Sequence, residues 1–274
     1  MDYQALLTQM LPIVQEVGAF ILQEQQTFTL EQVEYKGKND LVSYVDRNSE
    51  LMLVERLNRL TPGCGYINEE GGSSDTGQDL VWIIDPVDGT TNFVHNIPMF
   101  CTSIALRAEG QLQLGIIYEP TRLEMFTAVR GQGAHLNGRP IHVSANARSE
   151  DAFLSTGFPY RKNQNIDDYL QILREYLGRI RGIRRMGSAA LDLAYTACGR
   201  FDGFFEASLS PWDVAAGALL VQEAGGQVSD YWGADNWLFG RSILASNGHL
   251  HPELLRIMVS YLERLGLQHG SPLE

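Results

Sequence analysis

The hydrophobic pattern of this chain predicts an α+β fold made of stacked layers of helices and sheets. Two helical segments open the chain, and a group of short apolar runs bounded by turn residues follows them. Through the second half, helix-like and strand-like segments alternate. The 274 residues, 44% of them hydrophobic, can bury a sizeable core as one large domain or as two fused halves.

The first half is expected to form two helices and then a sheet. Residues 2–25 place apolar side chains at helical spacing, and residues 46–60 do so again before a Thr-Pro-Gly sequence ends the helix. Apolar runs predict strands at 80–85, 101–107, 112–118 and 123–129. Glu109 and Gly110 predict a hairpin between the second and third of these strands. The turn-rich residues 131–141 are expected to close the sheet.

The second half is expected to alternate between strands and helices. Two strands are predicted at 151–156 and 203–206. Helices are predicted at 166–180, 188–199, 213–224 and 251–265. The least structured stretch, residues 145–151, is a weak boundary, which would divide the chain into halves of about 1–145 and 146–274.

Charge and composition exclude several classes of protein. The formal net charge of −12 argues against a nucleic-acid-binding surface, which normally carries a basic patch. We find neither a basic leader with a small-residue cleavage site nor an apolar stretch near the ~18 residues of a membrane span. Three cysteines, Cys64, Cys101 and Cys198, lie far apart and predict neither a disulfide framework nor a zinc site. We therefore expect a cytoplasmic protein that does not contact a membrane.

The sequence DPVDGTTN at 85–92 is the strongest functional signal. It follows a predicted buried strand and places Asp85 and Asp88 at the strand end. Pro86 favours an extended Asp85, and Gly89 lets the backbone approach a ligand. Hard cations such as Mg²⁺ prefer carboxylate oxygens together with substrate phosphate. Asp-Pro and Asp-Gly are also ordinary turn dipeptides, but the strand before them and the Thr pair after them favour a metal site.

Three further acids have both a structural and a functional interpretation. Glu69 belongs to a Glu-Glu pair, which is commonly a solvated surface feature, and only one of two adjacent side chains is expected to reach a shared site. Asp46 and Asp213 each stand at the start of a predicted helix, where an acid is normally a cap. A capping carboxylate is also rigidly held, so it could both cap and bind metal. The segment 36–39 could fold over a phosphate or form a plain surface loop.

Together these sequences resemble the inositol monophosphatase family of Mg²⁺-dependent, lithium-sensitive phosphatases. The matching strings are DLVSYVD at 40–46, NEE at 68–70, WIIDPVDGTTNFVH at 82–95 and WDVAAGALLVQEAGG at 212–226. The segment GSAALDLAYTACGRFDGFFE at 187–206 is especially similar to the bacterial inositol-1-monophosphatase branch. Asn68 departs from many relatives, which carry Gly or Thr there. The resemblance implies a single domain over 1–274 with a layered α-β-α-β-α sandwich of the sugar-phosphatase type.

The resemblance also implies a set of metal ligands. A first Mg²⁺ would be held by Glu69, Asp85 and the main-chain carbonyl of Val87. A second would be held by Asp85, Asp88 and Asp213, and Glu69 would share a weaker third.

Catalytic and substrate contacts are implied in the same way. Thr90, supported by Asp46, would orient the attacking water, with Glu69 also taking part in catalysis. The amides of Gly89 and Thr90 would bind phosphate oxygens. The remaining substrate contacts would come from Gly187, Ser188, Ala189, Glu206 and Asp213. His95 is not needed as a general base, because a water activated by metal requires no imidazole.

The expected activity is hydrolysis of myo-inositol monophosphate by metal-activated water. Fructose-1,6-bisphosphate, histidinol phosphate and NADP remain alternative substrates. Adenosine 3′,5′-bisphosphate is disfavoured, because its phosphatases tend to read DPIDGTKGF where this chain has Thr91, Asn92 and Phe93. A different alternative is a protein that acts mainly by binding transcription machinery, as some bacterial members do. The family commonly forms homodimers, so we expect one here.

Overall fold

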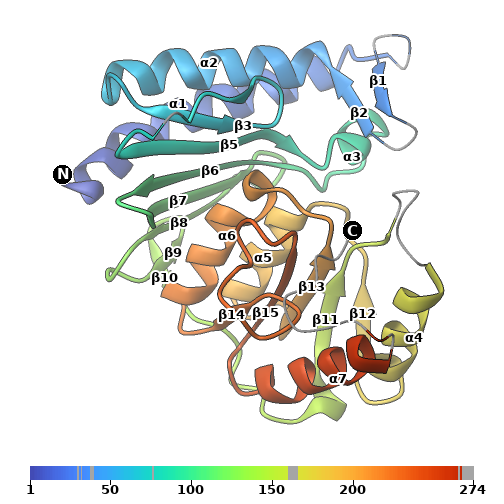
Figure 1. Ribbon diagram of the computed structural model, residues 1–274. Helices are drawn as coiled ribbons and strands as arrows, with labels where there is room; N and C mark the ends of the chain where they lie inside the picture. The colour runs from blue at the N-terminus through green and yellow to red at the C-terminus, as the bar shows by residue number, and fades with distance from the viewer. Residues whose placement is uncertain are drawn as a thin grey trace.

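The computed structural model describes residues 1–29, 31, 33–37, 40–75, 77–159, 166–264 and 266. Two large sheets and three helical layers alternate in the order α-β-α-β-α, and β1 and β2 form a separate two-stranded sheet (Figure 1). The layered α+β fold predicted from the sequence is confirmed. Part of the 36–39 segment, Lys38 and Asn39, lies outside the described residues.

The first layers consist of two long helices on a mixed sheet of eight strands. The helices are α1 (Tyr3–Gln25) and α2 (Tyr44–Leu60). The sheet has the order β10-β9-β8-β7-β6-β5-β3-β4. Its strands are β3 (Gly65–Asn68), β4 (Gly72–Ser73), β5 (Leu80–Asp88), β6 (Cys101–Ala108), β7 (Gln111–Glu119), β8 (Glu124–Val129), β9 (Ala134–Leu136) and β10 (Arg139–Ile141). Short elements complete this region: β1 (Val33–Gly37), β2 (Asp40–Ser43) and α3 (Thr90–Val94).

The helical layer in the middle is shared by both sheets. Helices α5 (Ala189–Ala197) and α6 (Pro211–Glu223) lie between the two sheets (Figure 1). A single hydrophobic cluster joins Ile83 and Ala105 of the first sheet, Leu193 and Leu219 of the two helices, and Phe204 of the second sheet. One continuous core therefore connects the two sheets.

The last layers consist of a five-stranded sheet and its outer helices. The sheet has the order β12-β11-β13-β15-β14, with parallel pairing of β11 to both of its neighbours. Helices α4 (Ile166–Leu177) and α7 (His251–Arg264) cover its outer face (Figure 1). The strands are β11 (Phe153–Thr156), β12 (Gly182–Arg184), β13 (Gly203–Ala207), β14 (Gln227–Ser229) and β15 (Ser242–Ser246).

The predicted helices and the four central strands of the first sheet are confirmed, with shifted ends. Helix α6 begins at Pro211, because proline suits the first turn of a helix. The strand expected from 151 begins at Phe153, because residues 149–151 form a 3₁₀ turn. The hairpin at Glu109 and Gly110 is confirmed, and both residues have positive φ. Among the strands that the sequence did not predict, β15 lies inside the second sheet.

Helix α1 is more apolar than we expected, since we found no apolar stretch near the length of a membrane span in the sequence. An 18-residue window within it has a mean hydropathy of 1.5, so by length and composition this helix could cross a membrane. Its buried side chains instead join a cluster with strand residues such as Trp82, Ile104 and Leu114. An apolar helix that packs on a sheet in this way is a core element of the fold.

Candidate metal centre

The end of β5 holds its two acids in a bent backbone. Residues 81–84 are fully buried and pair with β3 on one side and β6 on the other. The pairing with β6 shifts between Asp85 and Asp88, so the strand bends there. The Thr102 hydroxyl donates to the Pro86 carbonyl over 2.9 Å, and the Val87 amide donates to Asp85 Oδ1 over 3.0 Å. The bend therefore has fixed geometry before any ligand binds.

Asp213 approaches the same place from α6. Carboxylate oxygens of Asp85, Asp88 and Asp213 all lie within 4.8 Å of one another. Asp213 also closes a capping box, in which the Ser210 amide donates to Asp213 Oδ2 over 2.6 Å. The Ser103 hydroxyl of β6 donates to the Trp212 carbonyl over 3.1 Å and ties this first turn to the sheet. Asp213 thus closes a capping box and also lies in the acidic cluster, while its binding of metal stays a prediction.

Crowding of negative charge dominates the electrostatics of the cluster. Burial raises the pKa of Asp85 well above its usual range, and the charges of Glu69, Asp88 and Asp213 raise it further. Burial also raises the pKa of Asp88. Buried acids this close need a compensating positive charge or protons. Oxygen-only donors around such a charge deficit fit a hard divalent cation.

Asp88 is held by the start of α5. The Ser188 hydroxyl donates to Asp88 Oδ2 over 2.5 Å, and the Ala190 amide donates to the same oxygen over 2.7 Å. These bonds favour the charged carboxylate and oppose the effect of burial on its pKa. The segment that the family resemblance places in the alcohol pocket therefore also supports a member of the acidic cluster. Its contact with substrate stays a prediction.

The side chains of Thr90 and Asp46 are in contact, as the family resemblance predicts. Thr90 Oγ1 lies 3.1 Å from Asp46 Oδ1 and 3.1 Å from the Val87 carbonyl oxygen. Asp46 Oδ2 accepts bonds from the Ser43 amide at 2.9 Å and the Ser43 hydroxyl at 2.6 Å. Burial raises the pKa of Asp46, and the bonds from Ser43 oppose that effect.

The helix-cap interpretation of Asp46 and Asp213 needs one correction. The N-cap residues are Ser43 and Ser210, and each acid closes a capping box from the third helical position. A serine hydroxyl suits the cap position, while the acid three residues later reaches back to the cap amide. Each box directs one carboxylate toward the site.

Gly89 occupies a position that only glycine fits. Its φ of 95° lies in the left-handed region. A Cβ there would lie 2.9 Å from the Met99 carbonyl and 3.3 Å from the Gly187 carbonyl. A side chain would therefore separate the turn after β5 from the segment that leads into α5.

Glu206 lies beside the cluster on β13. Burial raises its pKa to about 8, with smaller contributions from Asp213 and Asp88, while Arg185 acts in the opposite direction. Gly187 and Ala189, whose contact with substrate stays a prediction, flank Ser188 at the start of α5. His95, which we excluded as a base, is exposed at the end of α3.

Some residues near the site were not identified from the sequence. Asp192 is 1% exposed in α5, and its Oδ1 has no hydrogen-bond partner among the described residues. Burial, with the nearby charge of Glu206, raises the pKa of Asp192 well above its usual range. The signal was an acid within the apolar helix 188–199. Asn92 Nδ2 donates to the Met99 carbonyl at 2.7 Å and to the Met186 carbonyl at 3.0 Å, which joins α3 to the approach to α5.

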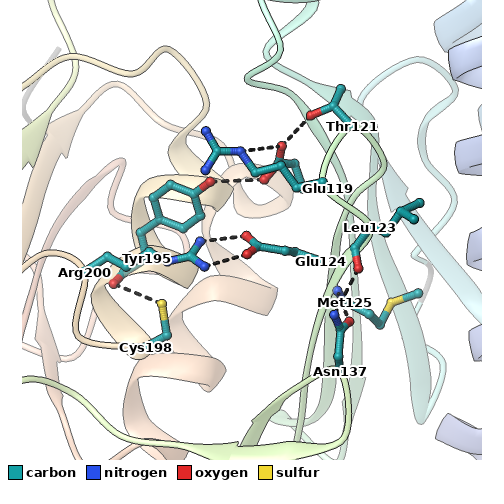
Figure 2. A network of polar contacts seen from close by, with 10 residues as sticks. Glu119, Thr121, Leu123, Glu124, Met125, Asn137, Tyr195, Cys198 and Arg200 are labelled. Atoms are coloured by element: carbon teal, nitrogen blue, oxygen red, sulfur yellow. Dashed lines mark hydrogen bonds and ion pairs between the residues drawn. The ribbon is translucent and has the colours of Figure 1, made fainter.

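The opposite end of α5 is anchored to the first sheet. The Tyr195 hydroxyl donates to the buried Glu119 over 3.0 Å, and the Thr121 hydroxyl donates to the other Glu119 oxygen (Figure 2). Arg200, just beyond α5, makes two bonds with the Glu124 carboxylate at 2.5 and 2.6 Å (Figure 2). These contacts fix the helix whose first turn holds Asp88.

Comparison with known proteins agrees with this geometry. A family model described as the inositol monophosphatase family matches residues 2–263. The Nus factor SuhB of Pseudomonas aeruginosa is 44% identical over 264 residues, which cover 94% of this chain and 97% of that protein.

Two solved structures have the same fold. The extragenic suppressor protein suhB of Bartonella henselae has a TM-score of 0.87 at 40% identity, covering 93% of this chain and 98% of that one. The inositol monophosphatase of Anabaena (Nostoc) has a TM-score of 0.85 at 36% identity, covering 95% of this chain and 97% of that one. With the family match extending over nearly the whole sequence, the chain belongs to the inositol monophosphatase family.

Proposed function

We propose that the protein is a Mg²⁺-dependent phosphatase that hydrolyses myo-inositol monophosphate and related small phosphomonoesters. The observation that carries the proposal is the group of three carboxylates within 4.8 Å beside the Thr90 and Asp46 pair. Fructose-1,6-bisphosphate, histidinol phosphate and NADP remain alternatives. Family membership and the name of the Anabaena protein support inositol monophosphate as the first substrate to test.

The acids would hold the cations in two overlapping sets. Glu69, Asp85 and the Val87 carbonyl form one set, and Asp85, Asp88 and Asp213 form the other, with Glu69 also available for a weaker third ion. Bound there, Mg²⁺ supplies positive charge to phosphate oxygens and makes water more acidic. The carboxylates would hold the cations in position, while the amides of Gly89 and Thr90 would bind phosphate oxygens.

Thr90 would position the attacking water. Its hydroxyl has one proton and two acceptors within 3.1 Å, Asp46 Oδ1 and the Val87 carbonyl. If Val87 serves as a cation ligand, the proton points to Asp46. A lone pair of Thr90 Oγ1 is then available to accept a proton from water. The buried Asp46 has a raised pKa, so it is a better proton acceptor than an exposed aspartate.

A substitution in the acidic cluster tests the proposal. Asp88→Asn keeps the shape of the side chain but removes a charge from the metal site, so phosphate release should become undetectable. The assay compares myo-inositol 1-phosphate with the alternative substrates, with Mg²⁺, with EDTA, and with added lithium, which we expect to inhibit. Glu175→Gln, which changes an exposed pair with Arg179, is the matched control. Full activity after removal of divalent metal would contradict the mechanism.

A second candidate function is binding to transcription machinery. It is favoured by the name Nus factor carried by several relatives at 41–46% identity. The Asp88→Asn variant separates the two functions in cells that lack the wild-type gene. If the variant abolishes inositol phosphate turnover but still reverses the deletion phenotype, binding is the function that cells require.

The cellular setting and assembly are part of the proposal. A cytoplasmic location is supported by the three cysteines, all of which are free thiols. A homodimer is supported by exposed apolar side chains on α4, namely Ile166, Leu170 and Leu177. Light scattering should give twice the chain mass, and a monomer at micromolar concentration would refute the dimer.

A further inference from the structure

Glu206 occupies the space that a side chain at residue 157 would need. Gly157 directly follows β11, whose Thr156 pairs in parallel register with Phe205 of β13. Glu206 and Gly157 are therefore neighbours at the ends of adjacent strands. A Cβ on Gly157 would lie 1.8 Å from Glu206 Cδ and 1.9 Å from Oε1, far inside van der Waals contact.

Space, not backbone conformation, is what requires glycine here. Gly157 is absent from the described residues with positive φ, so an alanine could adopt its backbone angles. The Glu206 carboxylate lies against the bare backbone of the strand end. With any side chain at position 157, this carboxylate would have to move.

Glu206 lies near the metal site without joining the group of converging acids. That group, among the described residues, consists of Asp85, Asp88 and Asp213. Charges on Asp88, Asp213, Asp192 and Arg185 act on Glu206 or are influenced by it. A carboxylate beside the cations, but outside their ligand group, is placed to accept hydrogen bonds from the alcohol part of a substrate.

We propose that Gly157 is a specificity-determining residue, because its missing side chain holds the Glu206 carboxylate where it selects phosphate esters that carry neighbouring hydroxyl groups. This inference rests on the proposed phosphatase function. Gly157 touches no substrate itself and acts through Glu206, so it is a positioning residue.

The test compares two substrates that differ in their hydroxyl groups. Myo-inositol 1-phosphate offers a ring of hydroxyls to Glu206, whereas p-nitrophenyl phosphate offers none. Gly157→Ala should raise KM for the inositol ester by about three- to tenfold, the usual effect of losing a hydrogen bond between neutral groups. The kcat of Gly157→Ala for the inositol ester and its kcat/KM for p-nitrophenyl phosphate should both stay within about twofold of the wild-type values.

A double-variant cycle shows whether Gly157 acts through Glu206. Glu206→Ala should raise KM for the inositol ester similarly, and adding Gly157→Ala should change it no further. Gly182→Ala is the matched control, since a Cβ on this glycine of the neighbouring strand β12 would meet Phe153 at an ordinary 3.5 Å. If Gly157→Ala alone does not fold, the double variant should fold, because truncating Glu206 frees the required space.

Several results would overturn the inference. It fails if Gly157→Ala leaves KM for the inositol ester unchanged, or if kcat/KM falls equally for both substrates. It also fails if the KM increases of the two single variants multiply in the double variant, or if the double variant does not fold. In each of these cases an active wild-type enzyme leaves the proposed function intact. A wild-type protein that hydrolyses neither substrate would reject the proposed function and this inference together.

Discussion

His251 is a buried histidine held between two serine hydroxyls. Its Nε2 lies 3.1 Å from Ser229 Oγ, and its Nδ1 lies 3.0 Å from Ser246 Oγ. Ser229 donates its proton to the Asp230 carbonyl, so the His251 Nε2–H donates to Ser229 and Nδ1 accepts from Ser246. Burial lowers the pKa of His251 to about 4.

Acid should therefore destabilise the protein through His251. The unfolded histidine binds a proton below pH ~6.5, whereas the folded one stays neutral down to about pH 4, so stability is lost as pH falls through this window. Between pH 7 and 4.5 we expect a loss of about 2 kcal/mol in the free energy of unfolding. Urea titrations at both pH values should show a smaller loss for His251→Gln than for wild type. The exposed His249→Gln should behave like wild type, and a parallel response of all three proteins would reject the assignment.

Asp85 gives the opposite pH dependence when metal is removed. Its pKa is raised by burial first and then by Glu69, Asp88 and Asp213. An acid whose pKa is raised in the folded state holds a proton there that it releases on unfolding. The stability of the metal-free protein should therefore fall as pH rises from about 4.

Asp85→Asn should consequently be more stable than wild type without metal and less stable with it. In EDTA at pH 8 the amide carries no charge to repel its neighbours, so the variant should melt higher. Saturating Mg²⁺ should stabilise wild type by about 3 kcal/mol at a hundred times its dissociation constant, and the variant by much less. Melting curves at pH 5 and pH 8 measure both effects. A variant that melts below wild type in EDTA would show that crowded charge does not limit the metal-free fold.

At the scale of elements, α5 and α6 touch through a glycine. A Cβ on Gly217 would lie 2.4 Å from the Leu193 Cβ, so an added methyl group would push the two helices apart. The N-terminal turn of α5 holds Asp88, and that of α6 carries Asp213. The distance between these helices therefore sets the distance between two predicted metal ligands.

Gly217→Ala should cost stability and weaken Mg²⁺ binding. Overpacking costs ~1–3 kcal/mol, which exceeds the gain of up to ~1 kcal/mol in helix propensity. Chemical denaturation gives the first quantity, and the Mg²⁺ dependence of melting gives the second. Gly178→Ala, where a Cβ would meet the Arg174 carbonyl at 3.7 Å, is a control that should change neither. If Gly217→Ala is destabilised but binds Mg²⁺ as tightly as wild type, the distance between the two helices does not control the geometry of the metal ligands.

Elements with strong local signals were predictable. Amphipathic periodicity identified α1, α2 and α7, and apolar runs with a Glu-Gly turn identified the β6–β7 hairpin. Strand β15 lacks such a signal, because it is only five residues long, begins and ends with serine, and is buried throughout. A strand covered on both faces shows no alternation, so only its partners β13 and β14 define it.

On the scale of the whole molecule, one core unites both sheets. The middle helices contribute to a hydrophobic cluster that includes Ile83 of the first sheet and Phe204 of the second. We therefore propose that residues 1–274 form a single domain of two fused halves, about 1–145 and 146–274. Residues 142–148 run between the sheets without a regular element.

A single domain should unfold in one step. Without α5 and α6 the first half would expose the inner face of its sheet, and without that sheet the second half would expose the sides of these helices that pack against it, so the two halves should unfold together. Scanning calorimetry should give one symmetric heat-absorption peak in EDTA. Two resolved peaks, or a folded fragment after proteolysis between residues 142 and 148, would show independent halves.

The sequence by itself determined the helices, the central strands, the acidic residues and the family, because periodicity and motif strings are local properties. Only the tertiary structure decided that Ser188 meets Asp88, 100 residues away, whereas the family resemblance had already placed Asp213 beside Asp88. The tertiary structure also decided that Glu206 lies against Gly157. The physical reason is that such contacts depend on how layers stack and helices space themselves, which a linear pattern of residues does not encode.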